Sequence, residues 1–393
     1  MSTAGARPVL IAGGGIGGLS AALALAARGV GVHVLEAERE FSESGAGIQI
    51  GPNGSRILIG LGLGDALEAG AVRPEAVILR DGLSGRRLAS VPLGREALAR
   101  YGAPYYVAER RVLHRMLLDA ASRSPQIQLS TGIRLTACRE QGRGIAAGSD
   151  DGREIEGRAL VAADGVHSRL RSILFGRAPV FSGRNAWRAT AADAKSLAAS
   201  GDAVNLWLGP DAHMLHYRCG PGGPVNAVAI VGGEAASPGW GTRGDTGELA
   251  RHFSGWADEP LRILAGFKDW MRWPLLELAP MRRWSRGAAT LMGDAAHVLM
   301  PFLASGAVMA LEDAATLAAE MARTPDDPAE AFRAYEQRRM ARVGRVRRAS
   351  ARMGEIYHMS GAMRLARNLT LGAAPERLLS ARNDWLYGYR VEG

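Results

Sequence analysis

The sequence predicts an α/β fold, with a Rossmann-like domain, an inserted antiparallel-sheet domain and a C-terminal helical segment. Three observations predict this architecture. Short apolar strands alternate with helical stretches near the N-terminus, a pattern typical of parallel βαβ units. From about residue 179 to 284, strand-like runs instead follow one another directly. Most of the remaining chain is helix-forming and rich in arginine.

The length and composition suit about two soluble globular domains. The chain has 393 residues, of which 47% are hydrophobic and 22% charged. We expect the Rossmann-like domain to comprise 1–75, 110–178 and 286–350, the inserted domain 76–109 and 179–285, and the helical segment 351–393.

The formal net charge is +9, and only Lys195 and Lys268 among the 48 basic residues are lysine. The arginines are scattered, with Asp and Glu between them, whereas a nucleic-acid binder concentrates its basic residues on one element. We therefore expect no nucleic-acid partner. The positive surplus is either a solvated arginine-rich surface or a field that attracts an anionic substrate and an anionic nicotinamide cofactor.

The two cysteines, Cys138 and Cys219, form neither a disulfide framework nor a metal-ligand cluster. We therefore expect no metal site and a reducing, cytoplasmic location. Residues 1–8 lack a signal-peptide pattern, and no apolar run approaches the roughly 20 residues of a membrane span. No membrane span is expected.

The first βαβ unit is predicted by residues 9–36. Residues 9–12 are an apolar run that ends in glycines, as in a buried parallel strand. Residues 19–28 are rich in Ala and Leu, and Gly29 ends this predicted helix. Residues 32–36 form the next strand.

The turn between this strand and helix, residues 13–18, reads GGGIGG and matches G-x-G-x-x-G. Gly13 permits the tight turn, Gly15 lets a pyrophosphate approach the backbone, and Gly18 lets the helix pack closely on the strand. The helix N-terminus attracts phosphate, and Glu36 can accept a hydrogen bond from a ribose hydroxyl. The pattern predicts a dinucleotide site. The alternative is a glycine-rich turn without a ligand.

The remaining elements are predicted from glycines that mark turns and from the spacing of hydrophobic residues. In the first domain we expect loops at 45–47 and 52–54, helices at 54–61, 110–122 and 307–322, and strands at 127–130, 135–138, 160–163 and 289–292. In the inserted domain we expect strands at 204–208, 213–219 and 225–231. Helical sequence continues to about residue 371.

Two further motifs follow apolar strands. Residues 164–171 read DGVHSRLR, and residues 293–297 read GDAAH. Asp164 and Asp294 each stand at a strand end beside a glycine, where a carboxylate can hold ribityl or ribose hydroxyls. Either motif alone would more often be a simple turn, but the order of all three motifs is distinctive.

Together these motifs resemble those of the single-component, FAD-dependent aromatic hydroxylases. The stretch at 45–49, GAGIQ, is similar to that family's second loop, and Arg110 to the arginine that reaches the flavin. The resemblance covers nearly the whole chain and implies that the first domain binds FAD non-covalently. It assigns the FAD contacts to Gly13, Gly15, Gly18, Glu36, Gly47, Arg110, Leu135, Asp164, Asp294, Gly306 and Ala307.

A narrower resemblance, to 3-hydroxybenzoate 6-hydroxylase, is carried by residues 303–310, 363–368 and 384–389. Salicylate and 6-hydroxynicotinate hydroxylases share the layout. The resemblance implies hydroxylation of a small phenolic acid by O2 through a flavin C4a-hydroperoxide, and a homodimer. NADH or NADPH is expected to visit transiently, because the sequence contains only one dinucleotide fingerprint.

His213 is the first candidate for the base that activates the phenol, since proton transfer to a positioned base contributes about 10²–10⁴-fold. On strand 213–219, His213 and Tyr217 share one face, and His216 lies on the other. Tyr217 is expected to orient a carboxylate or a phenol. Alternatively, His213 is a satisfied sheet histidine and Tyr217 a packing residue.

Arg188 and Pro301 are the candidate substrate contacts. Arg188 can pair with a carboxylate, although a surface arginine is the alternative. Pro301 departs from the 3-hydroxybenzoate 6-hydroxylase pattern, which has Gln at this position and thus one more hydrogen-bonding group. This departure leaves the substrate and the ring position open.

The motifs bear on three other functions. A flavin-dependent halogenase requires an active-site lysine and a W-x-W-x-I-P stretch, which residues 187–189 do not supply. A non-catalytic flavoprotein that senses redox state would retain the FAD motifs. A hydroxylase of a larger aromatic natural product fits the same motifs.

Overall fold

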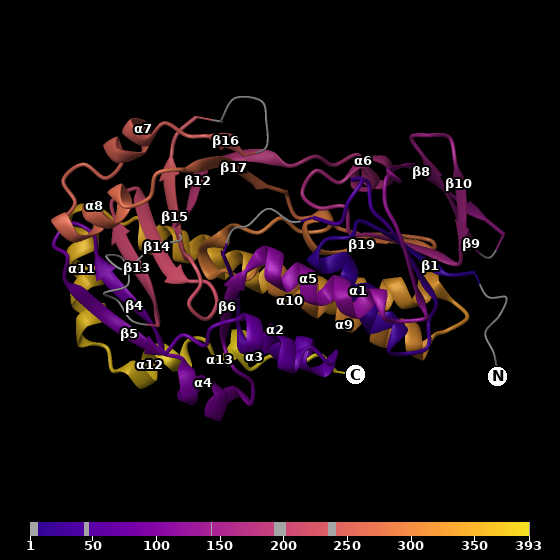
Figure 1. Cartoon of the computed structure of the whole chain (residues 1–393), viewed down its shortest axis with the longest axis horizontal. Coiled ribbons are helices and arrows are strands. Elements are labelled where there is room, and N and C mark those ends of the chain that lie inside the picture. Colours follow the sequence, from indigo (N-terminus) through magenta and orange to yellow (C-terminus); the bar gives the residue numbers. More distant parts are fainter. Residues whose placement is uncertain (1–6, 43–46, 143, 192–201, 235–240, 393) are drawn as a thin grey trace.

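The computed structural model describes residues 7–42, 47–142, 144–191, 202–234 and 241–392. It has a mixed α/β architecture with two principal sheets at opposite ends of an elongated molecule (Figure 1). The predicted fold class is confirmed. No helix in the described part of the chain is long and apolar enough to cross a membrane.

The six-stranded sheet contains the predicted βαβ unit. Its order is β18 (Ser285–Arg286), β19 (Ala289–Leu291), β11 (Ala159–Ala162), β1 (Val9–Ala12), β2 (Val32–Leu35) and β7 (Ile127–Ser130). All pairs are parallel except β18–β19. The strands β1 and β11 are buried throughout, which explains their continuous apolar sequence.

The helix α1 (Ile16–Ala26) follows β1 and begins three residues earlier than expected. Glycine is a poor helix former, so the sequence favoured a later start. In the structure, Gly17 and Gly18 lie within the first turn, where their lack of a side chain permits close packing. The helices α5 (Arg110–Ser122) and α9 (Gly306–Arg323) pack against α1.

The large sheet has eight strands. Its order is β16 (Thr242–Arg243), β17 (Met271–Glu277), β12 (Val180–Ala191), β15 (Val225–Gly232), β14 (Ala212–Arg218), β13 (Ala203–Gly209), β4 (Ala76–Asp81) and β5 (Arg87–Pro92). Among the strand pairs that the structure describes in this sheet, β13–β4 is parallel and the others are antiparallel. One face carries Trp187, Trp207 and Met214. These side chains form a core with apolar residues of α7 (Thr246–Arg251), of α8 (Asp258–Ala265) and of the segments that follow each helix.

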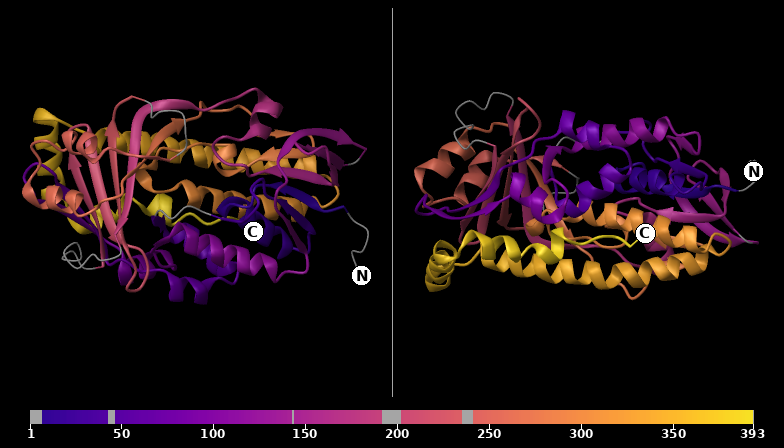
Figure 2. Two further views of the ribbon diagram at one scale, coloured as in Figure 1. Left: turned by 45° about the horizontal axis from the view of Figure 1, so that its top comes forward. Right: turned by 90° about the horizontal axis from the view of Figure 1, so that it is seen from below.

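The remaining elements join and cover these sheets. They are β3 (Gly47–Ile50), α2 (Pro52–Gly60), α3 (Gly64–Gly70), α4 (Gly94–Tyr101), β6 (Tyr106–Glu109), β8 (Leu135–Gln141), β9 (Gly144–Ser149), β10 (Glu154–Gly157), α6 (Arg169–Phe175), two 3-10 turns at Gly293–Ala295 and Pro301–Leu303, α10 (Pro328–Tyr357), α11 (Gly361–Ala373), α12 (Glu376–Ala381) and α13 (Asp384–Tyr387). Figure 2 shows α10 running along much of the molecule and leading into α11.

Several predicted elements need correction. Gly47 begins the strand β3 rather than a loop, because it pairs with Glu109 of β6; residues 45–46 lie outside the described part. The helix α2 begins at Pro52, since proline is well suited to the first helical turn. The strands β12 and β17 were missed. β17 contains Pro274 and is half-buried at every position, so neither alternation nor a buried run identified it.

Candidate active site

A cavity of about 950 Å³ lies where the carboxyl ends of β1, β2, β11 and β19 face the large sheet. This is the edge at which parallel α/β sheets bind dinucleotides. Its volume is near the upper end of ordinary ligand pockets, which span roughly 300–1,000 Å³. The predicted residues on its lining are Gly13, Gly15, Glu36, Gly47, Arg110, Leu135, Asp164, Arg188, Tyr217, Asp294, Pro301, Gly306 and Ala307.

Gly18 and His213 are the two predicted residues that do not line this cavity. Gly18 instead lies against the backbone, where an added Cβ would come within 1.9 Å of the Gly13 carbonyl oxygen. Gly13 has φ +104°, and a Cβ there would lie 2.5 Å from the Ala163 carbonyl oxygen. Both positions therefore require glycine, as the fingerprint predicts.

The carboxylate of Glu36 fixes the glycine turn. Its Oε2 accepts a hydrogen bond from the Gly14 backbone N–H at 2.7 Å, and its Oε1 accepts one from Glu38 N–H at 2.8 Å. On the other side, His114 Nε2 lies 2.8 Å from the Gly14 carbonyl oxygen. His114 is buried on α5 and was not predicted to act here, because its sequence position gives no sign of this contact.

Two carboxylates face the cavity from the other strand ends. Burial raises the pKa of Asp164, and its Oδ1 is buried without a hydrogen-bond partner in the structure. Burial also raises the pKa of Asp294, although Arg110 and His297 lower it. Asp164 thus has an acceptor oxygen available for a ligand hydroxyl.

The start of α9 forms another wall of the cavity. Gly306 and Ala307 are its first two residues, and nothing lies within 4 Å of where a Gly306 Cβ would be. The free N–H groups of an 18-residue helix carry a partial positive charge at this end. This wall suits a ligand edge that carries negative charge.

These features together fit FAD. The glycine turn can accommodate a pyrophosphate, Glu36 stands at the end of β2 for a ribose, and Asp164 has an unpaired acceptor for ribityl hydroxyls. The helix start can face the flavin pyrimidine.

The large sheet supplies an apolar wall with two polar side chains. Leu215, Val228 and Ile230 form the apolar surface, and Arg188 and Tyr217 stand beside it. The registers 188–228, 215–228 and 213–230 place these residues on one face, opposite the tryptophan core.

In the described part of the chain, no carboxylate is among the groups that act on the charge of Arg188. Its Nε has no hydrogen-bond partner, and its guanidinium lies 5.6 Å from the centre of the Trp273 ring. Burial lowers the pKa of Arg188, and the positive charge of Arg110 lowers it further. A buried cation of this kind is stabilised by an anionic ligand.

Tyr217 is a buried hydroxyl donor. Burial raises its pKa well above the usual tyrosine value, and the amides of Gln49 and Asn226, which stand beside it, only partly offset this. Tyr105 donates a hydrogen bond to Gln49 Oε1 at 2.6 Å, and Gly47 N–H donates one to Asn226 Oδ1 at 3.0 Å. Both amides are thus held in place around Tyr217.

His213 lies at the border of the cavity. It pairs with Ile230 in the sheet and shares the face of Leu215, so its ring stands directly beside lining residues. Its Nδ1 is 2.8 Å from Nε2 of His358. Burial lowers the pKa of His213 well below its usual value, which keeps the imidazole neutral. His216 points to the opposite face, as predicted from strand alternation, and burial lowers its pKa to about 4.

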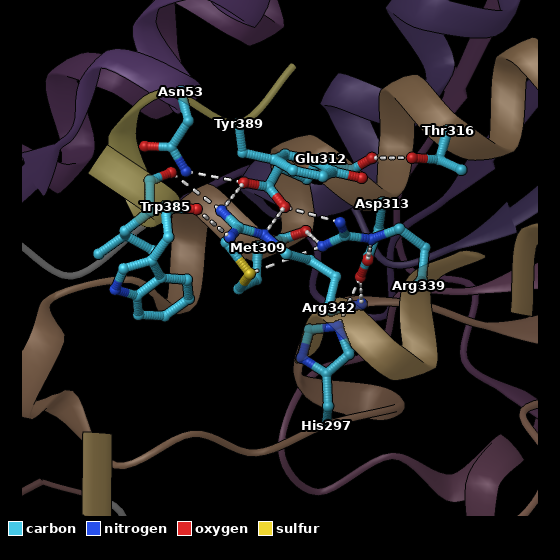
Figure 3. A network of polar contacts seen from close by, with 12 residues as sticks. Asn53, His297, Met309, Glu312, Asp313, Thr316, Arg339, Arg342, Trp385 and Tyr389 are labelled. Atoms are coloured by element: carbon cyan, nitrogen blue, oxygen red, sulfur yellow. Dashed lines mark hydrogen bonds and ion pairs between the residues drawn. The ribbon is translucent and has the colours of Figure 1, made fainter. Parts of the chain in front are cut away.

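A buried ionic cluster supports the Gly293–Asp294 turn (Figure 3). Asp313 Oδ2 accepts hydrogen bonds from Gly293 N–H at 2.9 Å and from His297 Nε2 at 2.6 Å. Its Oδ1 accepts one from Arg339 Nε at 2.6 Å. The turn that presents Asp294 is therefore fixed from behind by α9 and α10.

Glu312 completes this cluster. It accepts hydrogen bonds from Arg339 and Arg342, and Arg342 also donates to the carbonyls of Trp385 and Leu386. The sequence does not reveal how Glu312 and Asp313 are paired, because their arginine partners lie on another helix. The two arginines are buried, and nothing distinguishes them in sequence from the other arginines of α10.

A dinucleotide cradle joined to an apolar pocket with isolated polar groups defines a flavin-dependent oxidoreductase. A model of the family described as FAD binding domain matches residues 6–350, and the chain belongs to this family. The chain is an FAD-dependent aromatic monooxygenase. The predicted family, class of enzyme and FAD cofactor are confirmed.

Several curated proteins are similar over nearly their full length. A 3-hydroxybenzoate 6-hydroxylase of Polaromonas naphthalenivorans is 37% identical over 388 residues, covering 98% of this chain and 96% of the relative. A 3-amino-4-hydroxybenzoate 2-monooxygenase of Streptomyces platensis is also 37% identical, with 98% and 97% covered. A 6-hydroxynicotinate 3-monooxygenase of Bordetella bronchiseptica is 35% identical, with 87% and 90% covered.

Solved structures share the fold. Klebsiella pneumoniae HpxO complexed with FAD and uric acid has 28% sequence identity and a TM-score of 0.86, with 97% of each chain covered. A salicylate hydroxylase substrate complex has 23% identity and a TM-score of 0.82, with 99% of this chain and 97% of that chain covered.

Proposed function

We propose that the protein hydroxylates a small phenolic aromatic acid of the 3-hydroxybenzoate or salicylate type, with O2 and with NADH or NADPH as transient electron donor. The observation that carries this proposal is the unpaired Arg188 beside Tyr217 on the apolar wall of the cavity. The names of the relatives, which act on hydroxylated benzoates and a nicotinate, support it.

FAD would lie along the strand ends. Gly13, Gly15 and Gly18 would shape the pyrophosphate site, and Glu36 would bind the adenosine ribose. Asp164, Asp294 and Arg110 would hold the ribityl and flavin side, with Gly47, Leu135, Gly306 and Ala307 against the rest of the cofactor. FAD, when bound and reduced, supplies the activated oxygen. The ranges 1–75, 110–178 and 286–350 would thus form the FAD-binding domain.

The substrate would bind against the large sheet, in the domain formed by 76–109 and 179–285. Arg188 pairs with the carboxylate, a charge-assisted contact that a neutral donor cannot match. The Tyr217 hydroxyl donates a hydrogen bond to the same acid. Leu215 and Ile230 pack on the ring and exclude water, which strengthens the ion pair.

His213 is the proposed base. Its neutral imidazole accepts the phenol proton at Nε2, which increases electron density on the ring where the oxygen is transferred. Pro301 lines the cavity directly before Phe302, which contacts the His213 ring, and it offers no hydrogen-bonding side chain. The position of the phenol is therefore set by His213 and Arg188 without an additional amide.

We also propose that the protein forms a homodimer, by family resemblance, and that it is cytoplasmic, since two cysteines suit a reducing compartment. Light scattering of the FAD-loaded protein tests the oligomeric state, with a dimer mass expected and a monomer mass contradicting the proposal.

The test of the function is NADH and NADPH oxidation by the FAD-loaded protein with a panel of aromatic acids. The panel contains 3-hydroxybenzoate, salicylate, 3-amino-4-hydroxybenzoate, 4-hydroxybenzoate and 6-hydroxynicotinate, with products identified by mass. One of them should accelerate oxidation and yield a hydroxylated product. Acceleration that yields only hydrogen peroxide would identify an effector rather than a substrate. If no compound accelerates oxidation, the proposal is wrong and a larger aromatic compound becomes the better candidate.

A further inference from the structure

Two buried histidines from distant parts of the chain are hydrogen-bonded at the border of the cavity. His213 on β14 places Nδ1 at 2.8 Å from Nε2 of His358, which follows the last residue of α10. The ring centres are 5.0 Å apart, with a tilt of 35° between the planes. Only one hydrogen can lie between two neutral imidazoles, so one ring must donate and the other accept.

The pair extends outward from the cavity. His213 is 2% exposed and stands beside Ile230, which lines the cavity. His358 is 8% exposed and is the outer member of the pair. The rings of Phe302 and Tyr357 pack against His213, with ring centres 5.6 and 5.3 Å from its own.

The charged neighbours of both rings are cationic. Arg184 of β12 lowers the pKa of both histidines, and Arg367 of α11 lowers that of His358. From the β13–β14 turn, Asp211 approaches with its backbone, donating N–H to the His358 carbonyl at 3.4 Å. In the described chain, no carboxylate hydrogen-bonds either ring, and Tyr357 is the remaining titratable neighbour. Burial is the main reason that both pKa values are low, to about 3 for His358. Both rings are therefore neutral at physiological pH.

We propose that His213 and His358 form a two-imidazole proton relay that carries the phenol proton from the cavity to solvent. The substrate O–H bond breaks as a bond forms to His213 Nε2. The Nδ1–H bond of His213 breaks as a bond forms to His358 Nε2, and the Nδ1 proton of His358 passes to water. Neither ring becomes a stable cation beside Arg184. The reverse transfers restore both tautomers when the product is reprotonated. This inference rests on the proposed function, with His358 acting through His213.

The relay is tested by proton release on substrate binding. FAD-loaded protein without NADH is mixed, in weak buffer with a pH indicator, with the phenolic acid that the panel identifies, and phenolate absorbance is followed in parallel. In the wild type, phenolate formation and proton release should occur in one fast phase. His358→Gln should slow both by about 10²-fold or more, in the range of general-base effects, while His213→Gln should abolish phenolate formation.

Two controls distinguish loss of the proton relay from a folding defect. His358→Ala should regain the fast phase when imidazole is added, because His358 is the outer ring; a merely structural histidine would not respond. His216→Gln, a buried histidine on the opposite face of the same strand, should leave both phases unchanged. A wild-type rate in His358→Gln, with phenolate lost in His213→Gln, would overturn the relay and leave the function intact.

A measurement without substrate tests the relay independently. For His213 to accept a proton at Nε2, its Nδ1 must carry the hydrogen that is shared with His358. ¹⁵N spectra of histidine-labelled protein, assigned with the two Gln variants, should show His213 protonated at Nδ1 near neutral pH. Protonation at Nε2 instead would overturn the proposal even if the panel yields no substrate.

Discussion

The two walls of the cavity recognise their ligands by different means. The wall at the strand ends recognises its ligand largely through backbone atoms. It has glycine positions that tolerate no Cβ, and it includes the free N–H groups at the start of α9. The wall on the large sheet works through a few side chains, Arg188, Tyr217 and His213, set among aliphatic residues. Backbone recognition depends on local spacing and suits a cofactor that is always the same. Side-chain recognition can change one residue at a time, as substrate choice requires.

The largest expected effect is loss of FAD binding at the wall formed by the strand ends, the backbone wall. Gly18→Ala should prevent FAD retention, because its Cβ would meet the Gly13 carbonyl oxygen at 1.9 Å and neither backbone can move aside. Flavin absorbance that remains with the protein after gel filtration measures this. Gly31→Ala is the control, since its Cβ would have nothing within 4 Å. If both variants retain FAD equally, the backbone account of this wall is wrong.

On the wall formed by the large sheet, the side-chain wall, a single substitution should slow hydroxylation and leave FAD bound. His213→Ala should lower the rate of hydroxylation by about 10²–10⁴-fold through loss of the base. Single-turnover product formation and FAD content are measured on the same sample. An unchanged hydroxylation rate would contradict the role of His213, and loss of FAD would contradict the independence of the two walls.

The third prediction concerns the cluster behind the backbone wall. Arg339→Met leaves Glu312 and Asp313 buried without their shared partner and should lower the free energy of unfolding by about 3–5 kcal/mol. Urea denaturation measures this. Arg243→Met removes an exposed pair with Asp269 and should cost at most about 1 kcal/mol. Equal effects for the two variants would show that the cluster contributes little.

Arg188→Met should weaken binding of the carboxylated substrate by about 10–100-fold, as expected for loss of one hydrogen-bonded charge pair. Dissociation constants from flavin absorbance changes measure this. The matched control is a phenol of the same ring pattern without the carboxylate, whose affinity should not fall. If the affinity for both compounds falls equally, Arg188 shapes the pocket rather than pairing with the carboxylate.

The smallest effect concerns pH. Burial alone would raise the pKa of Asp313, but His297 and Arg339 outweigh this and lower it to about 2. Its contribution to stability, about 2 kcal/mol from this difference, is therefore present above pH 4 or so and is lost as pH falls toward 2. Asp313→Asn should be less stable at neutral pH and show a flatter decline below pH 4. Parallel declines in both proteins would contradict this assignment.

The same contrast explains what the sequence could predict. The glycine turn, Glu36, Asp164 and Asp294 follow strands at fixed local spacing, so their convergence on one cavity was predictable. His213 and His358 are 145 positions apart, and Arg339 approaches Asp313 from another helix. No local pattern encodes such pairings. Among the described residues no carboxylate acts on Arg188, which is likewise a property of the folded sheet. The strand β17, which supplies the neighbouring Trp273, was not predicted at all.

The most direct test of the central claim is turnover of the FAD-loaded protein under ¹⁸O2 with the best compound of the panel. If the cavity holds FAD on one wall and a phenolic acid on the other, the product should carry one heavy oxygen atom on the ring. Its amount should match the NADH or NADPH consumed. Arg188→Met should form little product at the same substrate concentration. A product that contains only oxygen from water, or reductant consumed without ring hydroxylation for every compound, would contradict the claim.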